Sequence, residues 1–133
     1  MVEALVMTKI EVTLSSEYGI MFLFDSKVRP KFPAESGKEP VMWTSTCLSF
    51  RVLIYVDGDA KITLCDDSEE TNCTEYFTGE IECPSKVLSL YDHNGLAFAS
   101  VPLEDGHARV SLRMSDEESP GVVECVIRNM KTF

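Results

Sequence analysis

Residues 107–114 read HARVSLRM, and this stretch decides the fold class. Every second residue is apolar, namely Ala108, Val110, Leu112 and Met114. Successive side chains of a β-strand point to opposite faces, so this pattern predicts a strand with one dry face and one wet face. The stretch KIEVTL at 9–14 alternates in the same way. Helical periodicity is weak along the whole chain, and no segment longer than about ten residues sustains it.

The same reasoning predicts nine strands. They lie near residues 8–14, 19–25, 46–56, 60–65, 75–83, 86–92, 96–102, 107–115 and 122–130. Three dipeptides that favour tight turns, Asp57-Gly58, Asn94-Gly95 and Asp105-Gly106, lie between apolar runs and predict hairpins. We therefore expect an all-β chain, a two-sheet antiparallel β-sandwich of about 8–9 strands, with a partly closed barrel as the alternative.

One domain is expected over residues 1–133, because a chain of 133 residues can bury a sizeable core and has no linker-like stretch. The longest loop, at 27–40, contains three prolines and a glycine. Loops of this length inside a compact domain often contact ligands or partners.

The formal charge of −10 is distributed unevenly. Residues 1–56 carry six acids and six bases, whereas residues 57–118 carry fifteen acids and four bases. This balance argues against direct binding of nucleic acid or an anionic membrane, and it favours a basic protein partner.

The five cysteines include no Cys-x-x-Cys pair and are expected to be free thiols in a reducing compartment. The first residues, MVEALVMTKI, lack the basic opening and long apolar run of a signal peptide, and no apolar stretch approaches the length of a membrane span. A cytoplasmic protein without a cofactor is the expectation.

The segment 66–82, DDSEETNCTEYFTGEIE, holds seven carboxylates and no lysine or arginine. If 75–83 is a strand, Phe77, Ile81 and Cys83 point inward while Tyr76, Thr78, Glu80 and Glu82 face solvent. Aromatic side chains anchor interfaces, and surrounding charge steers the encounter. We predict a protein-docking surface formed by Asp66, Asp67, Glu69, Glu70, Tyr76, Glu80 and Glu82.

Catalytic and metal sites have less support. Only His93 and His107 are available as histidine acid–base groups, both at predicted turns, and no nucleophile-elbow, P-loop or zinc-protease motif occurs. A calcium site would need Asp57 and Asp59 to converge with Asp66 and Asp67, but these pairs flank a single predicted strand. We expect no catalytic residues and no metal site.

The order of features resembles that of the competence-associated inhibitors of a DNA-entry nuclease. The resemblance rests on EVTLSSEYGIMFLFDS (11–26), LSF (48–50), DDSEE (66–70) and ASVPLEDGHARVSLRM (99–114). It implies a small acidic bacterial protein that binds and silences a nuclease, and it brings no catalytic residues with it. Two alternatives stay open: a module that binds calcium, a small molecule or a sugar at the sandwich rim, with Trp43 as a stacking residue, and a structural β protein that forms homo-oligomers through an edge strand.

Overall fold

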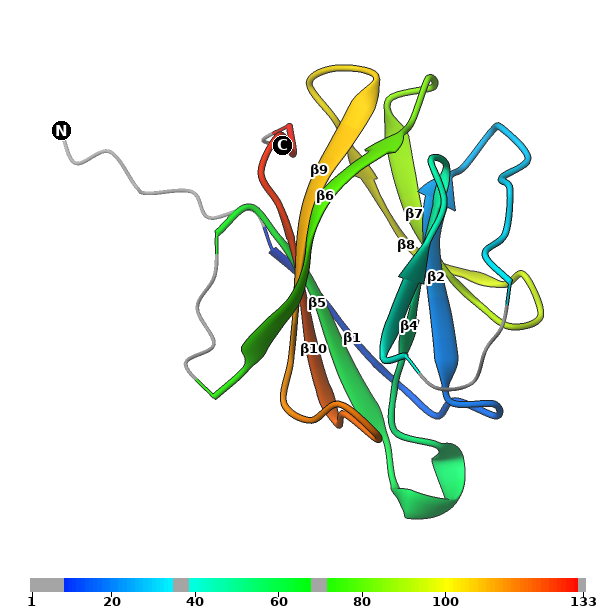
Figure 1. Ribbon diagram of the computed structural model, residues 1–133, viewed down its shortest axis with the longest axis vertical. Helices are drawn as coiled ribbons and strands as arrows, with labels where there is room; N and C mark the ends of the chain where they lie inside the picture. Colours follow the sequence, from blue (N-terminus) through cyan, green and yellow to red (C-terminus); the bar gives the residue numbers. More distant parts are fainter. Residues whose placement is uncertain (1–8, 35–38, 68–71, 132–133) are drawn as a thin grey trace, which may run out of the picture.

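The computed structural model describes residues 9–34, 39–67 and 72–131, which form two five-stranded sheets packed face to face (Figure 1). The first sheet contains, in spatial order, β1 (Lys9–Leu14), β5 (Ala60–Cys65), β10 (Val122–Ile127), β9 (His107–Met114) and β6 (Thr74–Glu82). The second contains β3 (Val41–Trp43), β4 (Cys47–Arg51), β2 (Ile20–Asp25), β7 (Val87–Asp92) and β8 (Ala97–Pro102). The predicted all-β sandwich is confirmed, and within these residues the sheets do not close into a barrel.

Both sheets contribute their inward side chains to one core. Met21 and Phe50 from the second sheet and Ile62 and Leu112 from the first are at most 1% exposed and belong to the same cluster. The alternating pattern of β9 is borne out, because its apolar residues are all buried. Burial alternates along the edge strands β1 and β6, whereas β5 and β10, with strands on both sides, are buried at nearly every residue.

The structure corrects several details of the predicted elements. The strand predicted over 46–56 ends at Arg51 and is followed by the short 3-10 helix η1 (Tyr55–Asp57). The strand β3, only three residues long, was missed because it is too short to show a period of two. One neighbouring pair, β5 and β10, is parallel rather than antiparallel.

Only one of the three predicted hairpin turns joins paired strands among the residues described. Asn94-Gly95 connects β7 to β8, and Gly95 adopts a positive φ of 81° there. Asp57-Gly58 and Asp105-Gly106 instead lie where the chain passes from one sheet to the other. A turn dipeptide reverses the chain, but burial of the flanking strands decides whether those strands pair.

At one edge of the sandwich, β3 of the second sheet and β6 of the first sheet are in contact. The Trp43 ring lies 4.8 Å from that of Phe77, and the Glu82 amide donates to the Ser45 carbonyl at 2.7 Å. The Trp43 side chain remains 57% exposed. Its ring therefore covers the core at this edge.

The described part of the long loop packs against the outer face of the second sheet. Phe32 makes edge-to-face contacts with Phe22 and Phe24, with ring centroids 5.5 and 5.6 Å apart. The Lys31 amide donates to Thr46 Oγ1 at 2.8 Å. Phe24 also stacks on Tyr91 at 4.0 Å. The Thr44 hydroxyl also donates to the Lys31 carbonyl, so residues 30–34 are held in place by aromatic packing and two hydrogen bonds with threonine side chains.

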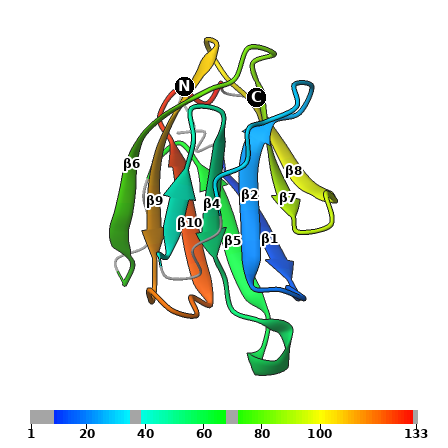
Figure 2. The ribbon, with the colours of Figure 1, turned by 45° about the vertical axis from the view of Figure 1, so that its right-hand side comes forward.

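Three connections meet at one end of the sandwich, here called the η1 end. They are residues 15–19, which join β1 to β2, residues 52–59, which contain η1, and residues 115–121, which join β9 to β10. In both views η1 extends beyond the ends of the strands (Figures 1 and 2). The sheet topology thus gathers loops that are far apart in the sequence.

Candidate functional site

The predicted docking residues Glu80 and Glu82 are exposed on β6, an edge strand of the first sheet. Their neighbours on β9 are Arg109, which pairs with Glu80 in the strand register, and His107, which pairs with Glu82. Same-face neighbours of opposite charge stabilise a strand pair. The Glu80 carboxylate therefore faces the guanidinium group of Arg109.

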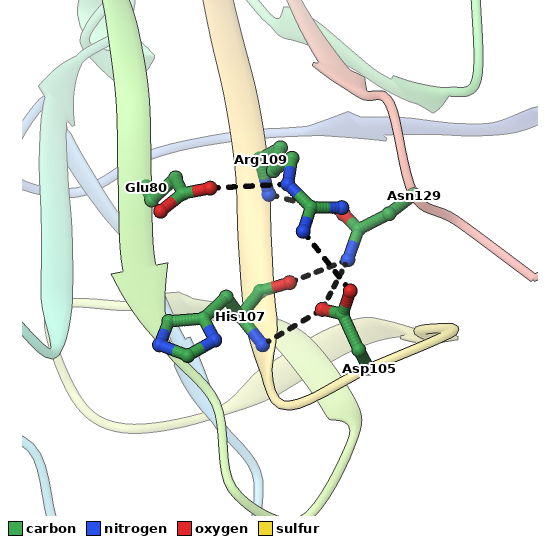
Figure 3. Close-up of polar contacts among 5 residues, drawn as sticks. All are labelled: Glu80, Asp105, His107, Arg109 and Asn129. Atoms are coloured by element: carbon green, nitrogen blue, oxygen red, sulfur yellow. Dashed lines mark hydrogen bonds and ion pairs between the residues drawn. The ribbon is translucent and has the colours of Figure 1, made fainter.

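Arg109 joins two carboxylates in the cluster drawn in Figure 3. Its Nε lies 3.0 Å from Glu80 Oε1, and its Nη2 lies 3.0 Å from Asp105 Oδ2. These hydrogen bonds, led by that to Glu80, raise the pKa of Arg109 above its usual value. Part of the negative charge predicted for this face is consequently neutralised within the molecule.

Asp105 and Asn129 fix the geometry of this cluster. Asp105 Oδ1 accepts from the His107 amide at 3.1 Å and from Asn129 Nδ2 at 3.0 Å, while Asn129 Oδ1 accepts from the Arg109 amide at 3.0 Å (Figure 3). The His107 amide and the Arg109 side chain lower the pKa of Asp105. The network ties the start of β9 to the segment that follows β10.

The other predicted docking residues lie elsewhere. Asp66 and Asp67 directly follow β5, and because β10 and β9 separate β5 from β6, they are about 14 Å from the β6 row at a strand spacing of about 4.8 Å. Glu69 and Glu70 lie outside the described residues. The structure thus brings Glu80 and Glu82 together but separates them from Asp66 and Asp67.

Tyr76 departs from its predicted orientation. The strand register shifts between Glu75 and Phe77, and Tyr76 is half-buried and packs against the core cluster. An irregularity of this kind breaks the alternation of a strand and re-aims the residue within it. The inward prediction for Phe77, Ile81 and Cys83 is confirmed, since their exposures are 8%, 1% and 0%.

Two more arginine side chains, Arg113 and Arg128, lie on the outer face of the first sheet. Arg113 Nε lies 3.5 Å from the buried Glu124, and its Nη2 donates to the Cys73 carbonyl at 2.7 Å. Arg128 Nη2 donates to Ser111 Oγ at 2.8 Å. This outer face is therefore of mixed charge, with carboxylates at its β6 edge and guanidinium groups along β9.

The two aspartate pairs considered for calcium are apart, because Asp57 and Asp59 precede β5 whereas Asp66 and Asp67 follow it. Across the described part of the chain, no three His, Cys, Asp or Glu side chains are grouped so that they could hold a metal ion. His93 and His107 are both exposed, and the ring of His93 lies 4.3 Å from that of Tyr18.

A second concentration of carboxylates, which sequence reasoning missed, is at the η1 end. The three connections that meet there contain six exposed acids and no lysine or arginine. These acids are Glu17, Asp57, Asp59, Asp116, Glu117 and Glu118. Their positions span a hundred residues of sequence, so only the topology shows that they share one end.

Backbone hydrogen bonds join the connections at this end. The Tyr55 amide donates to the Ser16 carbonyl at 2.8 Å, and the Leu53 amide donates to the Pro120 carbonyl at 2.8 Å. The Val52 amide reaches the Gly19 carbonyl at 3.0 Å. Main-chain hydrogen bonds thus join residues 52–59 to both of the other connections at this end.

Large apolar side chains are exposed on this same end. Tyr55 and Val56, both on η1, are 55% and 67% exposed, and Tyr18 is 54% exposed. Next to them is an open cleft of about 760 Å³, whose lining includes Tyr18, Ile54, His93 and Glu118. Tyr18, Ile54 and Glu118, one from each of the three connections, thus line the same cleft.

Comparison with known proteins gives one informative match. No family model matches the chain, and no curated protein matches it in sequence. A solved structure does match, described as ComJ, inhibitor of the DNA degrading activity of NucA, from Bacillus subtilis, with a TM-score of 0.64 over 92% of this chain and 98% of that one. The chain has the ComJ fold. Sequence identity to ComJ is 15%, so the match establishes the fold, and the predicted resemblance to nuclease inhibitors is confirmed at that level.

The described residues contain no helix of the length and apolarity needed to cross a membrane.

Proposed function

We propose that this protein is an inhibitor that binds a basic protein partner, a nuclease of the kind that acts on incoming DNA. The observation that carries the proposal is the near-complete structural match to ComJ in a chain with a formal charge of −10. A nuclease presents a basic cleft to the phosphates of DNA, and a rigid acidic domain is attracted to the same cleft.

On this proposal the protein acts by occupying a surface and is not an enzyme. The docking surface predicted from sequence stays part of the proposal, with Glu82, Asp67 and Asp66 as exposed or half-exposed carboxylates. Glu80 shares its charge with Arg109, so its contribution to the field is smaller. Charges of this kind act mainly by accelerating the encounter with the partner.

The same charge disfavours direct contact with nucleic acid or an anionic membrane. The five cysteines are all buried and none is in a disulfide, which suits a reducing compartment, and we place the protein in the bacterial cytoplasm. The proposal requires no cofactor.

The test is a DNA degradation assay with purified NucA as the probe. NucA is incubated with the protein at ratios from substoichiometric to tenfold excess before DNA is added. We expect degradation to stop near one equivalent, because an inhibitor that occupies the active cleft acts stoichiometrically. Undiminished degradation at tenfold excess would refute the proposal. An acidic protein of similar charge and unrelated fold serves as the control for non-specific electrostatic inhibition.

A further inference from the structure

We infer that the η1 end is the contact surface on which the basic partner docks, with Tyr55 and Val56 as its apolar anchors. The inference deepens the proposed function and rests on it. It places the contact itself at the η1 end. Asp66, Asp67 and Glu82 lie toward the opposite end of the strands, so they act only on the encounter with the partner.

The first argument is the exposure of apolar groups. The helix η1 has no buried residue, although it carries Tyr55 and Val56. More than half of each side chain, 55% for Tyr55 and 67% for Val56, is exposed to water, and apolar groups that cluster on a surface mark interaction sites. Tyrosine is also among the residues that most often dominate binding energy at interfaces.

The second argument is the charge around these anchors. The three connections that form this end hold six exposed carboxylates and no lysine or arginine. One cation is close by, since Arg51 at the end of β4 lines the cleft, where Glu39 and Glu118 also lie. The nearest cation on β5, Lys61, already lies 3.7 Å from Glu11. Like charges gathered in this way repel one another, and lysine or arginine side chains from a partner would relieve that repulsion. The charge thus selects a basic protein as the occupant.

The third argument is shape and order. The cleft of about 760 Å³ lies directly beside Tyr18 and Ile54, and it is open enough to admit a side chain or a loop from the partner. The main-chain hydrogen bonds from Tyr55 and Leu53 hold the surrounding loops together. A surface ordered before binding loses less conformational entropy when the complex forms.

The experiment compares four proteins in the NucA inhibition assay and in a binding-kinetics measurement with immobilised NucA. They are the wild type, an anchor variant (Tyr55→Ala with Val56→Ser), a charge variant of the η1 end (Asp59→Lys with Glu117→Lys), and a control (Val28→Ser) on the long loop. Val28 is 42% exposed, so it matches the anchors in character and exposure but lies away from the η1 end.

We expect the anchor variant to dissociate at least about tenfold faster and to lose inhibition in proportion, as for removal of a binding hot spot. The charge variant should associate more slowly, while the control should stay within about twofold of wild type. Melting curves must show that all four fold equally well, which is expected because every altered side chain is exposed.

The outcomes separate the two proposals. If wild type inhibits NucA and the anchor variant inhibits equally well, the η1 end is not the contact surface while the proposed function stands. If wild type itself does not inhibit NucA, the proposed function fails and the inference fails with it. If the anchor variant loses inhibition while the wild type and the Val28→Ser control keep it, both the proposed function and this inference are supported.

Discussion

At the scale of single residues, Asp25 shows how a buried charge supports this fold. It is 3% exposed at the end of β2, and its carboxylate accepts from the Lys27 amide at 2.7 Å, the Ser85 amide at 2.8 Å and the Ser85 hydroxyl at 2.6 Å. Desolvation opposes ionisation, but the hydrogen bonds from Ser85 and Lys27 outweigh it and lower the pKa of Asp25 below 3.8. The residue joins β2 to the turn before β7.

Replacing Asp25 by Asn should destabilise the protein by about 1–3 kcal/mol, because an amide NH₂ would face a main-chain N–H that now has a carboxylate acceptor. Since the folded-state pKa is depressed, the contribution of Asp25 is complete above the unfolded value of 3.8 and is lost as the pH falls through the folded value. Urea unfolding of both proteins at several pH values should show the difference shrinking in acid. A difference independent of pH would contradict this account.

The five cysteines are buried and unpaired by disulfides. Burial raises the pKa of Cys47 and of Cys83 to about 12, and that of Cys125 well above its usual value. Thiolates are the reactive form, so the folded protein should react with a thiol reagent at mildly alkaline pH only as fast as it unfolds. A colorimetric thiol titration should count five groups in denaturant and none rapidly in buffer. Fast native-state labelling of Cys47 or Cys125 would show that the core opens locally.

At the scale of elements, β6 shows what sequence patterning can and cannot give. The alternation of inward Phe77, Ile81 and Cys83 with outward carboxylates is local information, and it was predicted correctly. The irregularity that half-buries Tyr76 and the pairing of Glu80 with Arg109 depend on β9, which lies thirty residues away in sequence. The sequence therefore predicted the face of each β6 carboxylate but not its partner.

The ion pair changes the expected result of reversing the β6 charges. From sequence alone, lysine at Glu80 and Glu82 should relieve repulsion and leave the fold intact or slightly more stable. Glu80→Lys, however, would place a lysine directly opposite Arg109, and like charges across a strand pair destabilise it. We expect a lower melting temperature for Glu80→Lys than for Glu82→Lys, measured by circular dichroism. Equal melting temperatures for the two variants would show that the ion pair between Glu80 and Arg109 does not stabilise the fold in solution.

The η1 end could not be predicted from the sequence for the same reason, because it depends on contacts between distant segments. Segments 57–59 and 115–118 are acidic in the sequence, but nothing in either indicates that it lies beside the other. That arrangement follows from β4 and β5 belonging to different sheets, which places residues 52–59 as a crossing connection next to the β9–β10 turn. Long-range topology, rather than composition, creates the η1 end.

At the scale of the whole molecule, the distribution of carboxylates bears on metal binding. Asp57 and Asp59 lie at the opposite end of β5 from Asp66 and Asp67, so they cannot share one calcium ion. Millimolar calcium should raise the melting temperature no more than millimolar magnesium does. A rise of several degrees specific to calcium would favour a rim site in its place, because a ligand that binds only the folded state stabilises it.

The central claim is that an acidic sandwich with the ComJ fold silences a nuclease through charge-steered docking. Its most direct test is the association rate with NucA, measured by stopped-flow over a range of salt concentrations. Screening shortens the reach of the carboxylates to about 8 Å at physiological ionic strength, so the association rate should fall steeply as salt rises while the dissociation rate changes little. Association that is independent of salt, or the absence of any complex at low salt, would contradict the account.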